Sequence, residues 1–269
     1  VVFGATDLDP TPDSPDALYI SDTSVYDIHY RGYYKYYYFG RQLNCGDLNN
    51  DGYDDMVLGY GGYSDYIRSN SGSVHVIFGA PNISTGYFYM HQSTSYDIKY
   101  TGATSSEYLG HSDGHGSIHI GDINNDGIGD LLMGAMYADV GTSSTGAVYV
   151  IYGPPTRGDF DFANGGYDVR FYGGGSHYLG YGGIHVGDVN ADGLNDVIMS
   201  TSYSDYLRDN SGRAYVIFGD KNKLSGDIAI ENSANYDVSF NGGAANDYLG
   251  HYMNPGIADV DGDGLNDLM

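Results

Sequence analysis

The chain has 269 residues, enough to bury a sizeable core in one large domain or two small ones. Its 35 acidic residues outnumber 11 basic ones, and the formal net charge of -24 argues against nucleic acid or an anionic membrane surface as a partner. No apolar run reaches membrane-spanning length, so direct insertion into a bilayer is not expected.

Four landmarks recur in the same order with a period of about 70 residues. The first is an alternating strand that begins with Tyr-Asp, at 26–32, 96–102, 167–173 and 236–242. The second is an aromatic residue or Leu before Gly, at 37–40, 107–110, 177–180 and 247–250. The third is an Asp-rich loop, and the fourth is a β-branched strand that ends in Gly, at 74–79, 148–153 and 214–219.

Each repeat is predicted to hold four strands and no helix. Short apolar runs flank every acidic loop, so the loop joins two strands of a hairpin, and the Tyr-Asp strand and the β-branched strand complete the unit. Tandem four-stranded units predict an all-β fold, a β-propeller of four-stranded blades, whereas a β-sandwich array would need more strands per unit. We expect a single propeller domain or propeller fragment over 1–269, with repeats at approximately 5–79, 80–153, 154–219 and 220–269.

The ends of the chain leave the number of blades open. Residues 1–4 are an orphan β-branched strand, and the fourth unit stops before its own. Val1–Gly4 could complete the fourth unit and close a small four-bladed ring, or both ends could belong to a larger propeller, which we favour. The absence of an initiator Met suggests a processed protein or a piece of a longer one.

The acidic loops place oxygen-bearing side chains at positions 1, 3, 5 and 9, with Gly at position 6. Side chains at alternate positions converge when a loop curls around one point, and Gly permits the sharp turn. The residue at position 7 would contribute its backbone carbonyl. The candidate ligands, loop by loop, are Asp47, Asn49, Asp51, Tyr53 and Asp55; Asp122, Asn124, Asp126, Ile128 and Asp130; Asp188, Asn190, Asp192, Leu194 and Asp196; and Asp259, Asp261, Asp263, Leu265 and Asp267.

This pattern matches the first half of an EF-hand loop and predicts about four bound Ca²⁺ ions. All of the ligands are hard oxygens, which suit calcium, whereas magnesium demands a tighter octahedron. The alternative is a set of Asx turns, since Asn, Asp and Gly form turns without any metal. Four loops in register favour the metal, which explains why the carboxylates crowd together.

These motifs resemble the FG-GAP repeat of integrin α-subunit propellers and related extracellular proteins. The resemblance implies a propeller of usually seven blades, calcium on its lower rim, ligand recognition on the upper face, and an extracellular or cell-surface location. The chain departs from the family in its "GAP" element, which reads GYG at 59–61, GAM at 134–136 and STS at 200–202. Four repeats are also fewer than seven, which puts the blade count in doubt.

Three weaker features have a structural and a functional interpretation. The similar stretches 63–72 and 203–212 could form an aromatic and basic binding surface, although a packed turn repeated by duplication is the simpler reading. The Arg-Gly-Asp tripeptide at 157–159 is interpreted as a chance match in a chain rich in Gly and Asp. Cys45, the only cysteine, is expected to be a buried apolar residue, because other repeats have Ile120 and Val186 at its position.

No nucleophile motif or phosphate loop is apparent, and no catalytic residue is assigned. We therefore expect a calcium-binding extracellular propeller that mediates adhesion or surface or filament assembly, through a protein or glycan ligand at its loop face. Self-assembly is possible. The alternatives are the propeller domain of a secreted enzyme acting on carbohydrate or lipid, and a lectin.

Overall fold

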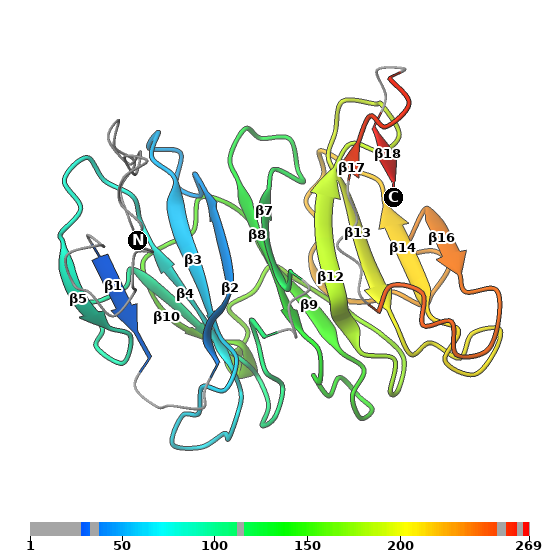
Figure 1. Ribbon diagram of the computed structural model, residues 1–269, viewed down its shortest axis with the longest axis horizontal. Coiled ribbons are helices and arrows are strands. Elements are labelled where there is room, and N and C mark those ends of the chain that lie inside the picture. Colours follow the sequence, from blue (N-terminus) through cyan, green and yellow to red (C-terminus); the bar gives the residue numbers. More distant parts are fainter. Residues whose placement is uncertain (1–27, 33–37, 112–115, 252–256, 263–265, 269) are drawn as a thin grey trace, which may run out of the picture.

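The computed structural model describes residues 28–32, 38–111, 116–251, 257–262 and 266–268. Figure 1 shows sheets standing side by side in a row, with the β1–β5 pair at one end and the β17–β18 pair at the other. The described residues form strands and one short 3-10 turn, Phe162–Asn164. The orphan strand predicted at 1–4 lies outside these residues.

Three complete blades occupy the middle of the row, each with its strands in sequential order from the inside outward. Blade one is β2 (Phe39–Gly46), β3 (Asp55–Tyr60), β4 (Ser73–Ile77) and β6 (Ile98–Thr101). Blade two is β7 (Ile118–Gly121), β8 (Asp130–Ala135), β9 (Ala147–Ile151) and β11 (Val169–Tyr172). Blade three is β12 (Leu179–Gly187), β13 (Asp196–Thr201), β14 (Arg213–Ile217) and β16 (Val238–Asn241).

The outer strand of each blade comes from the unit that follows it. We expected each Tyr-Asp strand to belong with the acidic loop after it, but β6 pairs antiparallel with β4, which precedes that loop. β11 and β16 pair with β9 and β14 in the same way. The chain turns back beside the strand it has just left before it begins the next hairpin, so blades are offset from repeat units by one strand.

A further short strand lies parallel to the outer strand of the preceding blade. These covering strands are β5 (Gly86–Tyr89) on β1 (Ile28–Arg31), β10 (Gly158–Asp161) on β6, and β15 (Gly226–Ala229) on β11. They extend blades one and two to five strands, and β1–β5 stays a separate pair. The last pair is β17 (Ile257–Ala258) with β18 (Asp267–Leu268).

The core lies between the blades. One apolar cluster joins blades one and two and includes Val76, Tyr100 and Leu131, and a second joins blades two and three and includes Val148 and Met199. Alternating residues on both faces of each sheet are therefore buried, which explains the apolar β-branched runs of β4, β9 and β14.

A glycine at the end of each inner strand lets the next blade approach closely. A Cβ atom on Gly46 would lie 3.0 Å from Ile120, and one on Gly121 would lie 2.6 Å from Val186. The prediction that Cys45 is buried is wrong, because its side chain is exposed. Its equivalents Ile120 and Val186 pack against the preceding blade, and no inner strand precedes β2 among the described residues.

Candidate functional site

The acidic loops lie where the prediction places them, at the turn between the two inner strands of each blade. They connect β2 with β3, β7 with β8, β12 with β13, and β17 with β18. The strand ends fix positions 1 and 9 of every loop against each other, so the intervening residues must curl. All four candidate sites therefore lie at the same end of their hairpins.

The first three loops curl through the same backbone hydrogen bonds. In each, the position 6 N–H donates to the position 1 carboxylate, at 2.9, 2.8 and 2.9 Å for Asp47, Asp122 and Asp188. The position 7 N–H donates to the position 5 carboxylate, at 2.9, 3.0 and 2.8 Å. The glycine at position 6 has φ of +86, +86 and +83°, a conformation that disfavours other residues.

The carboxylate at position 9 is buried and fixes the loop to the sheet. Asp55, Asp130 and Asp196 are all 0% exposed. Each accepts the N–H of position 2 and that of the glycine that ends the β-branched strand, at 2.8 to 2.9 Å. Burial raises the pKa of all three, that of Asp130 to about 6, and the carboxylates at positions 1 and 5 act in the same direction.

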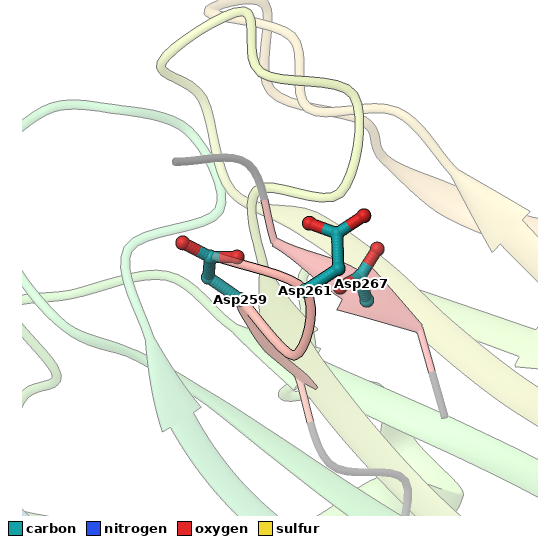
Figure 2. A group of neighbouring side chains, drawn as sticks. All are labelled: Asp259, Asp261 and Asp267. Atoms are coloured by element: carbon teal, nitrogen blue, oxygen red, sulfur yellow. The ribbon is translucent and has the colours of Figure 1, made fainter. Parts of the chain in front are cut away.

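In the fourth loop three carboxylates converge. One oxygen each of Asp259, Asp261 and Asp267 lies within 4.8 Å of the others. Figure 2 draws these three side chains on their loop. In the part of the chain that the structure describes, the other loops do not bring three acids this close, because position 3 is Asn there. The amides of Asn124 and Asn190 instead donate to carboxylates of their own loops. The predicted ligands Asp263 and Leu265 lie outside the described residues.

The donor set fits a hard divalent cation. Every side chain at positions 1, 3, 5 and 9 of the loops offers oxygen, and no sulfur or imidazole lies among the candidate ligands. Asx turns account for the N–H contacts, but they do not explain a buried carboxylate beside two others, an arrangement that like charges oppose. A bound cation would offset that repulsion.

The other end of the inner strands carries a second feature, a row of tyrosines. Tyr178 precedes β12, and Asp188 follows it, so the nine residues of this strand separate the row from the acidic loops by about 30 Å. Four tyrosines spaced by 70 residues adopt the left-handed conformation, with φ of 51 to 57°: Tyr38, Tyr108, Tyr178 and Tyr248. Bulky residues rarely adopt it, and its recurrence at one repeat position marks a constrained surface.

The tyrosines form a continuous aromatic face across the blades. Tyr137 and Tyr203, from the connections after β8 and β13, fit between the left-handed tyrosines. The ring centroids of Tyr108, Tyr137, Tyr178, Tyr203 and Tyr248 follow one another at 5.7, 5.4, 5.1 and 5.3 Å, all edge to face. A cavity of about 300 Å³ opens between Tyr137, Ser176, Tyr178, Tyr181, Tyr203 and Asn210.

Only part of this face was predicted from the sequence. For 63–72 and 203–212 the sequence left open an aromatic and basic surface but favoured a packed turn, and Tyr203 does belong to the row. Arg68, however, is held by Asp65 and Asp161 at 2.6 Å and serves the packing of its loop. The 70-residue spacing of the other tyrosines was visible in the sequence, but their contacts with Tyr137 and Tyr203 depend on the fold.

The Arg-Gly-Asp tripeptide has a structural role at the start of β10. Arg157 pairs with Asp97 and lies over the ring of Phe78, 4.7 Å from its centroid. Asp159 pairs with Lys99 at 2.6 Å. Both charges therefore hold the covering strand in place, in agreement with a chance match to the adhesion tripeptide.

Comparisons with known proteins support the repeat assignment. The FG-GAP repeat family model matches residues 39–77, 116–151 and 181–217. Each match runs from the inner strand to the β-branched strand of one blade, so three of the four predicted repeats are recovered, and the prediction of FG-GAP repeats in an all-β propeller is confirmed. None of the described helical segments is long and apolar enough to cross a membrane.

Curated relatives share parts of this chain. Integrin alpha pat-2 of Caenorhabditis briggsae is 32% identical over 118 residues, 43% of this chain and 9% of that protein. Integrin alpha-5 of Xenopus laevis is 29% identical over 44% of this chain and 10% of its own length. The phosphatidylinositol-glycan-specific phospholipase D of Dictyostelium discoideum is 27% identical over 75% of this chain and 22% of its own. The chain thus spans at most about a fifth of these relatives.

Proposed function

Because the chain carries FG-GAP repeats built as consecutive propeller blades, we propose that it is a calcium-binding extracellular propeller that mediates adhesion or surface assembly. Each acidic loop holds one Ca²⁺ ion, about four in all, through the side chains at positions 1, 3, 5 and 9 and the carbonyl at position 7. The aromatic face at the opposite end of the blades receives a protein or glycan partner.

The buried position 9 carboxylate is the observation that carries the calcium proposal. In three blades it is fully buried beside two further carboxylates, and in the fourth loop three acids converge within 4.8 Å. A bound dication offsets the repulsion among these groups. Because it binds only the curled loop, it also stabilises the folded chain, by about 2.7 kcal/mol at a hundredfold excess over its dissociation constant.

Metal content and thermal stability test this part of the proposal. Mass spectrometry on protein purified in calcium buffer should find about four calcium ions per chain. The melting temperature should fall in excess EDTA and return when calcium, but not an equal concentration of magnesium, is restored. An unchanged melting curve after confirmed metal removal would contradict the proposal.

The aromatic face is tested by substitutions that leave the core intact. Tyr137 is 36% exposed within the row, whereas Tyr87, on β5, is 50% exposed outside it. Tyrosines supply large contact areas in protein interfaces and stack on sugars, so Tyr137→Ala should weaken ligand capture and Tyr87→Ala should not. A glycan array and a panel of immobilised surface proteins would identify the class of ligand. Equal binding by both variants would place the ligand elsewhere.

The match to the phospholipase D supports a second candidate, since it extends over more of this chain than the integrin matches. In this alternative the chain is the propeller domain of a secreted enzyme that acts on lipid or carbohydrate, or a lectin. Turnover of a glycosylated phosphatidylinositol or a polysaccharide by the purified chain would favour the enzyme. Glycan capture without turnover would favour the lectin.

A further inference from the structure

The side chain at position 8 joins two of the acidic loops to the loop of the blade before. Asn195 of the third loop donates its side-chain amide to the backbone carbonyl of Asp122, position 1 of the second loop, at 2.8 Å. Asn266 of the fourth loop donates in the same way to the carbonyl of Asp188, position 1 of the third loop, at 2.9 Å. The partners lie 73 and 78 residues apart, in loops of different sheets, so both bonds connect separate blades.

The second loop makes no such bond to the first. Its position 8 is Gly129, and a Cβ atom there would lie 3.0 Å from the backbone carbonyl oxygen of Asp47, the equivalent acceptor. These two loops therefore lie side by side, but glycine has no side chain that could donate. The described residues thus contain two pairs of neighbouring loops linked by a side-chain amide and one pair without that link, which serves as a natural comparison.

On the donor side, Asn195 sits between two proposed ligands of the third loop. Leu194 precedes it and offers its carbonyl at position 7, and Asp196 follows it at position 9. The Asp196 carboxylate is already fixed by the N–H groups of Val189 and Gly219, at 2.8 and 2.9 Å. A cation bound by both ligands would hold the backbone on both sides of Asn195, so the direction of its amide depends on the occupancy of the third loop.

On the acceptor side, the bond ends on a residue that shapes the second loop. The Asp122 carboxylate accepts the N–H groups of Asp126 and Gly127, at 3.1 and 2.8 Å, and its carbonyl accepts the amide of Asn195. A proposed ligand of the second loop therefore has its backbone held by the third. A ligand group that is already in place loses less conformational freedom when the cation binds, which raises the affinity.

We propose that Asn195 and Asn266 are positioning residues that couple calcium binding among the second, third and fourth loops, whereas the first loop binds its ion without this coupling. The inference rests on the calcium sites of the proposed function and adds how those sites influence one another. Because coupling between binding sites is reciprocal, each linked loop strengthens the other by the same factor. The contribution of one hydrogen bond sets that factor at about two- to tenfold in affinity.

Calcium titrations followed by amide NMR test the coupling loop by loop. The position 6 glycines, Gly52, Gly127 and Gly193, each donate to the position 1 carboxylate of their own loop, so their amide signals report its occupancy. Asp192→Asn removes the position 5 carboxylate of the third loop and should raise the calcium concentration for half-occupancy at Gly127 by about two- to tenfold. Asp51→Asn, the same change in the first loop, is the matched control and should leave that midpoint unchanged.

Removing the bond should remove the coupling. In Asn195→Ala the midpoint at Gly127 should rise by at least the factor seen in Asp192→Asn, and combining the two substitutions should raise it no further. Reciprocity gives a second readout, because Asp126→Asn in the second loop should raise the midpoint at Gly193 by the factor that Asp192→Asn produces at Gly127. A residue that only held the fold together would not produce equal factors in both directions. The dispersion of the amide signals shows in the same spectra that each variant is folded.

The outcomes separate the coupling from the calcium binding on which it rests. If none of the three glycine signals responds to calcium, the calcium proposal fails and the coupling fails with it. If all three respond but Asp192→Asn moves the midpoint at Gly127 no more than Asp51→Asn does, the loops bind independently and only the coupling is overturned. The same conclusion follows if Asp192→Asn still shifts that midpoint in the Asn195→Ala background.

Discussion

Replacing Asp130 by Asn separates the destabilising effect of its buried charge from its proposed role as a calcium ligand. The group is fully buried, and burial raises its pKa to about 6 from 3.8. At pH 7 the ionised form carries at most about 3 kcal/mol of unfavourable free energy, which screening lowers to roughly 2 kcal/mol. Asn removes that charge but leaves the N–H of Ile123 or Gly153 without an acceptor, a loss of about 1–3 kcal/mol. The terms nearly cancel, so the free energy of unfolding in EDTA should change by less than about 1 kcal/mol.

With calcium present the same variant should differ clearly from the parent. It loses a ligand, so calorimetric titration should count one site fewer, and calcium should stabilise it less against urea. Asp168→Asn is the control outside the acidic loops, because this exposed carboxylate likewise accepts a backbone N–H, that of Tyr152 at 2.8 Å. That variant keeps an acceptor for this N–H, so any change in its stability should be the same with and without calcium, and it should keep every site. If Asp130→Asn binds as much calcium as the parent, position 9 is not a ligand and the reasoning fails.

Two further predictions concern buried groups in the blades. Burial, together with nearby Lys99, lowers the pKa of His75 to about 3. Below pH 6.5, therefore, this imidazole becomes protonated in the unfolded chain but stays neutral in the folded chain. Stability in EDTA should therefore fall by up to about 1.4 kcal/mol per pH unit below 6.5, and His75→Phe should flatten this slope in urea titrations. The Tyr149 hydroxyl donates to buried Glu107 at 2.5 Å. Tyr149→Phe should therefore lower the free energy of unfolding by about 1–3 kcal/mol more than Tyr215→Phe, the change at the same position of blade three. Equal losses in the two variants would show that the bond to Glu107 contributes nothing.

The sequence predicted the acidic loops well because everything that shapes them is local. Nine residues contain the turn, its glycine and every candidate ligand, and hairpin strands on both sides fix their ends. The repeat order likewise indicated the propeller, because each unit contains three strands that pair with one another. The family match from 39 to 77 corresponds to that local set in blade one.

The rest depends on contacts between residues distant in the chain. Gly158 of β10 pairs with Ile98 of β6, 60 residues earlier, and a four-residue strand carries too little periodicity to reveal such a partner. The exposure of Cys45 depends on whether the inner strand of another blade packs against its side chain. The aromatic face needs Tyr137 to reach Tyr178 from another blade, which composition and spacing cannot show.

The offset of the covering strands also sets the order in which the protein is completed during synthesis. The sheet that begins at Phe39 receives its last strand only when Asp161 has left the ribosome, after the inner hairpin of the next blade has already emerged. At every stage the newest finished blade presents one bare edge, and the next stretch of nascent chain is its nearest partner. Such delayed closure is slow and leaves edges open to neighbouring chains, so an arrest of translation between blades should yield aggregation-prone fragments.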